Sequence, residues 1–279
     1  MFYVIQENTF REENYDNLLE AVERLSLPYE IVQSKPFTDE VEFKTDRKDV
    51  FVFGSIKLAR TGRAYGWNPG SLLNDNHDYN VYSAIWGDML LNADSQVVKF
   101  GDEFDWDPSV TQYFIRPCED TKTFTGKLYD FYQWQEFKGR HFAEQAKFAE
   151  LNGGQRSSSL DMDSLIQIAT PKKILKEFRF WVVGGQVITG SQYRLGNRTV
   201  YDPLVDRDAW EFAQYAVKMF QLADAFVIDI AMIDVELESG WGLGVDPRYK
   251  IVEAGCINSA GFYRADLQKL VMALEDFYN

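Results

Sequence analysis

FVIDIAMID (residues 226–234) and KIVEAGCINSAGFY (residues 250–263) are the most informative segments of this 279-residue chain. Each contains an apolar run typical of a buried strand, and each run is interrupted by a carboxylate, Asp229 in the first and Glu253 in the second. A carboxylate in a buried strand is unstable unless a cation or a hydrogen-bonding partner compensates it. Oxygen ligands from adjacent strands suit a hard cation such as Mg²⁺, which in proteins usually accompanies phosphate. The two segments therefore predict nucleotide chemistry.

Composition narrows the class of protein. Hydrophobic residues make up 46% of the chain and aromatic residues 15%, which is typical of a globular protein with ring-rich cores. The formal net charge of −14 argues against a protein that coats nucleic acid, because such binding depends on clustered Lys and Arg. No window approaches 18 uncharged apolar residues, and the N-terminus lacks the pattern of a signal peptide. We therefore expect a soluble, cytoplasmic protein.

Cysteine and histidine are too scarce for several kinds of site. Cys118 and Cys256 are the only cysteines, and they are too far apart in sequence for a C-x-x-C metal site, so we expect reduced thiols. His77 and His141 are the only histidines, which excludes a His-rich zinc site. Neither lies near a G-x-S-x-G elbow, which argues against a Ser-His-Asp triad.

The N-terminal part of the chain predicts a small α/β lobe. Apolar periodicity indicates a strand, a helix and two further strands, at residues 1–6, 14–26, 28–33 and 49–54. Residues 61–80 are rich in Gly, Asn and Asp and predict a loop, followed by a helix over residues 83–92.

The rest of the chain predicts further strands and helices, beginning near Asp107. The expected strands are TQYFIRP, LIQIA, EFRFWVVGG, QVITGSQYRL, FVIDIAMIDV and YKIVEAG. Gly184 and Gly185 indicate a hairpin turn between the third and the fourth of these. The expected helices cover residues 129–150, 206–222 and 265–278, and a flexible connector covers residues 151–164.

Four segments in this order resemble the ATP-grasp superfamily. They are IRPCEDTKTFTG (115–126), IQIATPKKILKEFRFWVVGG (166–185), VIDIAMID (227–234) and IVEAGCINSAGFY (251–263). The chain is similar in particular to small stand-alone ATP-grasp proteins with an R-P-x-x-D-x-K-x-F-x-G segment and a terminal N-S-x-G-F-Y. The resemblance implies an α/β fold, an ATP-grasp fold in which two sheet-containing lobes clamp ATP. The pre-grasp α/β lobe would cover residues 1–105, the first grasp lobe 106–165 and the second 166–279.

The resemblance implies where the nucleotide binds. The lysine corresponding to Lys122 bridges the α- and β-phosphates of ATP, with Arg116 beside the same loop and Lys127 as a weaker candidate. The LIQIA strand resembles the hinge whose main-chain groups contact adenine. That hinge comprises Gln167, Ile168 and Ala169.

A second set of charged residues follows from alternation in KEFRFWVV. Glu177 and Arg179 fall on one face of the expected strand and Phe178 and Phe180 on the other. A half-exposed sheet gives the same alternation, so this pattern alone leaves a structural explanation open. The resemblance implies that Arg179 contacts the nucleotide or an acyl phosphate, with Glu177 secondary. Arg194 is a further cation for the transferred phosphoryl group.

The resemblance also implies a Mg²⁺ site built from Asp229 and Glu253. Relatives often add an Asn two residues after the Glu, but this chain has Gly255 there, so Asn258 is the nearest candidate for a third ligand. Asp234 is a competing aspartate, and a surface strand with solvated acids remains an alternative. Whether Gly255 weakens metal binding is left open.

The implied function is that of an ADP-forming carboxylate–amine ligase that uses ATP and Mg²⁺. A phosphotransferase on the same fold, and a non-catalytic nucleotide-binding or interaction protein, remain alternatives. Expected partners are a small-molecule or peptide carboxylate and a nucleophilic acceptor, rather than nucleic acid or membrane. The substrates, the pathway and the oligomeric state are left open. Residues 54–79 combine cations, rings and glycines, and we expect them either to contact the acceptor or to form a solvated loop. Their cations and rings include Lys57, Arg60, Arg63, Tyr65 and Trp67.

Overall fold

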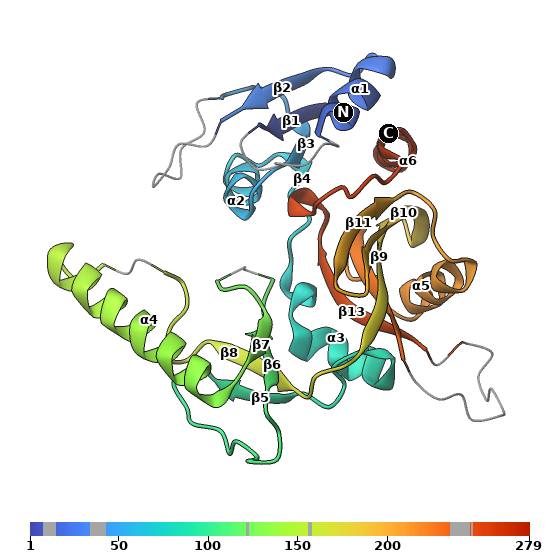
Figure 1. The fold of residues 1–279 in the computed structure, drawn as a ribbon. Helices are drawn as coiled ribbons and strands as arrows, with labels where there is room; N and C mark the ends of the chain where they lie inside the picture. Colours follow the sequence, from blue (N-terminus) through green and yellow to red (C-terminus); the bar gives the residue numbers. More distant parts are fainter. Residues whose placement is uncertain (8–14, 34–42, 121–122, 156–157, 235–245, 247) are drawn as a thin grey trace. The chain divides into compact units, whose positions relative to one another are not determined.

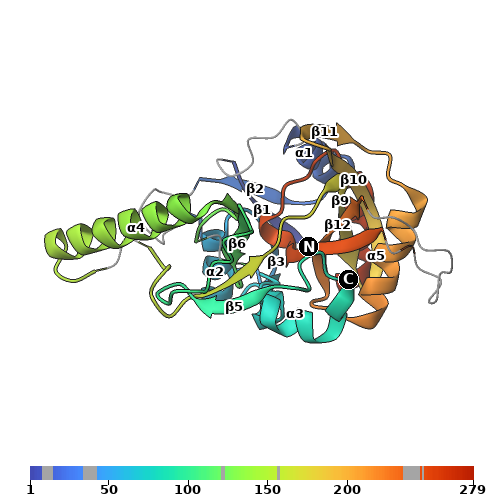
Figure 2. The same cartoon turned by 60° about the horizontal axis from the view of Figure 1, so that its bottom comes forward.

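The computed structural model describes residues 1–7, 15–33, 43–120, 123–155, 158–234, 246 and 248–279 (Figure 1). The chain forms two compact units. The first unit comprises Met1–His77, Val81–Leu91 and Lys173–Asn279, and the second comprises Asp78–Asn80 and Asn92–Lys172. Figure 2 shows the same elements from a second direction. Among the described residues, no helix is long and apolar enough to cross a membrane.

The first unit begins with a four-stranded parallel sheet in the order β2-β1-β3-β4. Its strands are β1 (Phe2–Gln6), β2 (Tyr29–Val32), β3 (Asp49–Phe53) and β4 (Asn68–Gly70). Side chains alternate along β1, so that Tyr3 packs with α1 (Tyr15–Arg24) and α6 (Leu267–Tyr278), while Val4 packs with α2 (Ile56–Ala64). Both faces are therefore covered, as is usual for a parallel sheet. The predicted strand, helix and strand are confirmed.

The predicted loop over residues 61–80 is wrong. Residues 61–64 complete α2, residues 68–70 form β4, and residues 75–77 form a 3₁₀ turn. The helix begins at Ser55, whose side chain accepts a hydrogen bond from the main-chain nitrogen of Leu58. It is held by burial of Leu58 and Ala59 against β3 and Trp67, so tertiary packing outweighs the helix-weakening Gly62. The helix expected at residues 83–92 is α3 (Tyr79–Trp86), which begins and ends earlier.

A five-stranded antiparallel sheet forms the rest of the first unit, in the order β11-β10-β9-β12-β13. Its strands are β9 (Ile174–Val183), β10 (Gln186–Leu195), β11 (Arg198–Asp202), β12 (Ala225–Ile233) and β13 (Tyr249–Cys256). Gly184 and Gly185 have φ of +56° and +76°, so the predicted hairpin turn is confirmed. One face carries Phe180, whose ring meets Trp210 of α5 (Arg207–Met219) edge-on at 5.7 Å. The other face is apolar where Trp181 and Val227 join the α6 cluster.

The second unit is a four-stranded antiparallel sheet with one long helix. The strands, in the order β5-β8-β6-β7, are β5 (Gln96–Lys99), β8 (Leu165–Ala169), β6 (Tyr113–Pro117) and β7 (Lys127–Tyr129). The helix α4 (Phe131–Leu151) starts with a capping box between Asp130 and Gln133 and packs Trp134 into a ring-rich core around Phe100. Because β5 pairs with β8, a segment numbered below 105 belongs to this sheet. The proposed lobe boundaries stay a prediction.

Candidate functional site

A row of polar residues crosses the five-stranded sheet of the first unit. The strand register pairs Ser191 on β10 with Arg179 on β9, Arg179 with Asp229 on β12, and Asp229 with Glu253 on β13. Residues directly opposite one another in antiparallel strands share a face, so all four side chains lie on one face. We call these four residues the polar row. The predicted convergence of Asp229 and Glu253 is therefore confirmed by the register.

Arg179 and Asp229 form a buried two-pronged ion pair. The Nε and Nη2 atoms of Arg179 donate to Oδ1 and Oδ2 of Asp229, each at 2.8 Å. Arg179 Nη1 also donates to the Gly261 carbonyl oxygen at 3.3 Å, and Arg179 Nη2 lies 3.9 Å from Glu253 Oε1. The exposed fraction is 9% for Arg179 and 2% for Asp229. Most donors of this guanidinium are thus used by the protein itself.

Burial and the surrounding charges act on the ionisation of this pair. Burial raises the pKa of Asp229 above its ordinary value, the nearby Glu253 and Glu177 carboxylates add to the rise, and Arg179 opposes it. Burial also works against the charge of Arg179, but its attraction to Asp229 outweighs that effect and leaves the pKa of Arg179 above its ordinary value. Arg179 is therefore the fixed positive charge of the row.

A β-bulge brings two consecutive side chains to Glu177. The register of β10 against β9 shifts between Gln192 and Arg194, so Arg194 pairs with Glu177 and Tyr193 is the extra residue. Arg194 Nη1 donates to Glu177 Oε1 at 2.7 Å, and the Tyr193 hydroxyl donates to Glu177 Oε2 at 2.6 Å. The same hydroxyl lies 3.3 Å from Asp229 Oδ2. Glu177 is 5% exposed, whereas the Arg194 side chain is 47% exposed.

Three tyrosine rings stack beside the Arg179 guanidinium. The Tyr263 ring centre lies 4.7 Å from Arg179 Cζ, 4.8 Å from the Tyr193 ring and 5.8 Å from the Tyr201 ring. Tyr263 and Arg264 have φ of +49° and +68°, a left-handed conformation that costs non-glycine residues energy. Burial raises the pKa of Tyr193 well above its ordinary value, and the nearby Asp229 and Glu177 carboxylates add to the rise, so its hydroxyl stays a donor. Glu253, with 32% of its side chain exposed, and Arg194 are the more accessible ends of the site.

Asn258 lies in a different environment from the polar row. Its side-chain nitrogen donates to the carbonyl oxygens of Val52 and Gly70, at 2.7 and 3.1 Å, and its side-chain oxygen accepts from the Leu72 nitrogen at 2.8 Å. The Cys256 sulfur also donates to that oxygen, at 3.2 Å. Asn258 is fully buried and links β3 and β4 to the 3₁₀ turn η3 (Ile257–Ser259). As a metal ligand it would exchange these hydrogen bonds for a cation, so that role stays a prediction.

The remaining predicted nucleotide residues belong to the second unit. Arg116 on β6 lies opposite Gln167 on the central strand β8, and the register of β8 with β5 ends at Ile168. Gln167 is 2% exposed, and its side-chain oxygen accepts from the Ser95 hydroxyl at 3.4 Å. The main chain at Ala169, where pairing with β5 has ended, is therefore the part of this strand best placed to contact a base. Lys122 lies outside the described residues.

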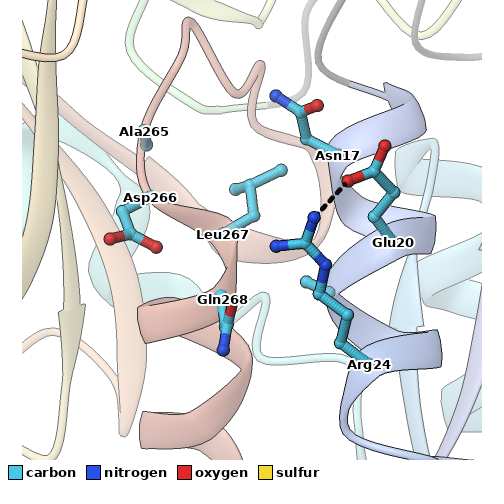
Figure 3. Close-up of a pocket in the computed structure, with 8 residues that line it drawn as sticks. Asn17, Glu20, Arg24, Ala265, Asp266, Leu267 and Gln268 are labelled. Carbon is cyan, nitrogen blue, oxygen red and sulfur yellow. Dashed lines mark hydrogen bonds and ion pairs between the residues drawn. The ribbon is translucent and has the colours of Figure 1, made fainter.

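A cavity of about 220 Å³ lies between α1 and the start of α6 in the first unit (Figure 3). None of the predicted site residues contributes to its lining. Arg24 is paired with Glu20 at 3.1 Å, and Asp266 caps α6 through the Lys269 nitrogen at 3.0 Å. The charged groups lining this cavity are therefore engaged locally.

Solved structures with this arrangement of elements define the class of the fold. The chain is similar to D-cycloserine synthetase DcsG, with a TM-score of 0.58 and 13% identity over 100% of this chain and 99% of that one. It is similar to the ATP complex of D-alanine–D-alanine ligase from Bacillus anthracis, with a TM-score of 0.57 and 12% identity over 99% and 96%. The ATP-grasp ligase PsnB, complexed with minimal precursor, gives a TM-score of 0.51 and 12% identity over 99% and 98%. The chain therefore has an ATP-grasp fold, as predicted.

The family is shown by a sequence model. Residues 97–274 match the model of an ATP-grasp domain family, family 3 of its clade, and the chain belongs to this family. The comparison with curated proteins found no match. The polar row has donor chemistry that fits Mg²⁺, because Asp229 and Glu253 supply two carboxylates from neighbouring strands. No group of three or more His, Cys, Asp or Glu side chains suited to a metal occurs among the described residues. Two carboxylates suffice when substrate phosphates complete the coordination.

Proposed function

We propose that the protein is an ADP-forming ligase that activates a substrate carboxylate with ATP for attack by an amine or another nucleophile. The observation that carries this proposal is the register-aligned row of Arg179, Asp229 and Glu253, with Arg194 beside it, in an ATP-grasp fold. The solved structures that resemble the chain are described as a synthetase and as ligases, which supports the same reaction class.

Asp229 and Glu253 would hold Mg²⁺, and Arg194 would face the transferred phosphoryl group. When bound, Mg²⁺ neutralises charge on the β- and γ-phosphates. Arg194 suits a ligand-facing role because its side chain is half exposed, whereas Arg179 is committed to Asp229 and Gly261. Arg179 would then act by holding Asp229 in place. Catalysis would come mainly from positioning and from compensation of charge.

The other predicted contacts extend the proposal to the rest of ATP. Lys122 and Arg116 would contact the phosphates, and the main chain of residues 167–169 would contact the adenine. Such main-chain recognition needs no particular side chain, which agrees with a buried, largely apolar strand at this point.

The proposed reaction has two steps. An oxygen of the substrate carboxylate attacks the γ-phosphorus, the bond from that phosphorus to the bridging oxygen breaks, and ADP leaves. The nucleophile then attacks the carbonyl carbon of the acyl phosphate, the carbon–oxygen bond to phosphate breaks, and phosphate leaves while an amine nucleophile releases a proton. The cations of the site would offset the charge that builds up on the γ-phosphoryl oxygens in the first step.

A non-catalytic nucleotide-binding protein is the second candidate. It is favoured by Gly255, which stands where relatives often have an Asn, and by Asn258, whose amide is engaged with the main chain of residues 52–72. A metal site with two protein ligands would bind nucleotide but turn it over slowly. A phosphotransferase is the remaining alternative on this fold.

The test is ADP release from Mg²⁺ and ATP in the presence of pooled carboxylates, with hydroxylamine as the trapping nucleophile. A ligase gives a hydroxamate, whereas a phosphotransferase gives a stable phosphorylated product. Asp229→Asn and Glu253→Gln should each lower turnover on the order of 100-fold. Asp234→Asn is the matched control, because Asp234 directly follows β12 and pairs with exposed Lys173 at 2.5 Å. Turnover that survives Asp229→Asn but not Asp234→Asn would transfer the metal role to Asp234.

A further inference from the structure

The bulge in β10 gives Tyr193 a position that the proposed roles do not account for. Its hydroxyl donates to Glu177 Oε2 at 2.6 Å and lies 3.3 Å from Asp229 Oδ2. A hydroxyl carries one hydrogen, so the shorter contact is the main hydrogen bond and the longer one is a secondary contact of the same hydrogen. One side chain therefore lies between two buried carboxylates of the site.

The bulge is what makes this arrangement available. In a regular strand, neighbouring side chains point to opposite faces, so Tyr193 and Arg194 could not both reach Glu177. The extra residue turns both toward it, and each takes one oxygen of the carboxylate. Bulges are enriched beside active sites, where they re-aim a side chain.

The contacts form a chain from the exposed to the buried end of the site. Arg194 contacts Glu177, Glu177 contacts Tyr193, Tyr193 contacts Asp229, and Asp229 contacts Arg179. The Tyr193 ring also stacks on Tyr263, which in turn lies over Arg179. Without the hydroxyl, the Glu177 and Asp229 carboxylates would lose their shared hydrogen-bond donor, and each would be held from one side alone.

We propose that Tyr193 is a positioning residue that fixes Asp229 and, through Glu177, Arg194 for a bound Mg²⁺–nucleotide. This inference rests on the proposed function only in requiring that the site binds nucleotide. It does not depend on which substrate accepts the phosphoryl group. Tyr193 touches neither reacting atom in this scheme and acts through its two carboxylate neighbours.

Tyr193→Phe tests the role because it removes the hydroxyl and keeps the ring that stacks on Tyr263. Tyr201→Phe is the matched control, since Tyr201 stacks on the same ring at 5.8 Å and is 39% exposed. The probe is a non-hydrolysable ATP analogue with increasing MgCl₂, read as the midpoint of thermal unfolding. We expect Tyr193→Phe to raise the half-saturating MgCl₂ concentration roughly tenfold, because Asp229 loses a hydrogen bond to a charged group. Tyr201→Phe should leave it within about twofold of the parent.

The half-saturating concentration separates positioning from loss of folded protein. A smaller folded fraction would lower the amplitude of any response without moving the concentration at which it is half complete. Glu177→Gln is a second variant that reaches the same contacts from the other side, and it too should raise the half-saturating MgCl₂ concentration. It keeps the test decisive if Tyr193→Phe folds poorly.

The outcomes distinguish the inference from the proposed function. A parent midpoint that responds to Mg²⁺ and the analogue, with an upward shift of the MgCl₂ requirement in Tyr193→Phe alone of the two tyrosine variants, supports the inference. A parent response that is unchanged in Tyr193→Phe, or shifted equally in Tyr201→Phe, overturns the inference and leaves the proposed function standing. A parent that does not respond to the nucleotide at all overturns both.

Discussion

Replacing Arg179 by Met should cost the first unit much of its stability. Asp229 is 2% exposed and both its oxygens accept from Arg179, so the variant leaves a buried carboxylate without its cation. Breaking such a pair from one side costs about 3–5 kcal/mol. Whole domains are stable by only about 5–15 kcal/mol. We therefore expect a loss of roughly a third or more of the free energy of unfolding.

The double variant Arg179→Met, Asp229→Leu should recover most of that loss. Replacing both charges by apolar groups removes the buried charge together with its partner, which is often close to neutral for stability. The coupling between the two substitutions should therefore be about 2–4 kcal/mol. The matched control is Lys173→Met with Asp234→Leu, an ion pair whose side chains are 75% and 49% exposed. Such an exposed pair should contribute less than about 1 kcal/mol.

Urea unfolding at pH 7 measures these differences. It should be followed by both far-UV circular dichroism and tryptophan fluorescence, so that separate transitions of the two units are seen. The reasoning is refuted if Arg179→Met costs less than about 1 kcal/mol, or if the double variant loses the sum of the two single losses.

The deficit of Arg179→Met should also depend on pH. Burial raises the pKa of Asp229, with the nearby carboxylates adding to the rise, and the variant loses the cation that opposes it. A group whose folded-state pKa lies above its unfolded-state pKa stabilises the fold when protonated, and this contribution is lost as pH rises through the folded-state value. Lowering the pH should therefore shrink the deficit relative to the parent, and an equal deficit at every pH would contradict the burial argument.

Three further predictions concern other parts of the structure. Asn258→Ala should cost about 2–4 kcal/mol in urea unfolding, because it leaves buried main-chain groups on β3 and β4 without their partner; a change confined to the half-saturating Mg²⁺ concentration would instead support metal ligation. Burial raises the pKa of the Cys118 thiol to about 12, so the native protein at pH 8 should resist iodoacetamide at Cys118 while urea-unfolded protein is modified; rapid native labelling of Cys118, located by peptide mapping, would contradict this. Arg60→Ala should raise the KM of the acceptor several-fold without changing ATP affinity, with exposed Arg24→Ala as the control; unchanged acceptor kinetics would leave α2 without a role at the site.

Much of the fold could be predicted because its longer elements carry strong periodic patterns. The strands around Asp229 and Glu253, the hairpin at Gly184 and the helix α5 all combine apolar periodicity with clear turn signals. The strands that were not predicted are short or exposed. β7 has three residues, and β11 is an edge strand whose side chains are mostly exposed, so neither buries enough apolar surface to leave a pattern.

The site could be predicted in part, for a related reason. Alternation in KEFRFWVV placed Arg179 on the same face as Glu177, and interrupted apolar runs singled out Asp229 and Glu253, which the register brings together. Tyr193 could not be found this way, because a bulge changes which face a residue occupies without an obvious signature in the sequence. The burial of the Asn258 amide depends on contacts with residues 188 and 206 positions away, which no local pattern reports.

The contacts of Asn258 and α6 also set an order of assembly during synthesis. The N-terminal parallel sheet receives one covering helix and its buried amide from residues 257–279, whereas residues 92–172 make their own sheet and core. On a ribosome, where domains fold as they emerge, the middle of the chain can complete its structure while the N-terminal strands still wait for their C-terminal partners. During that interval the Tyr3 and Phe51 face of the sheet lacks part of its cover, so the earliest-made segment of this protein is the one that depends longest on protection from aggregation.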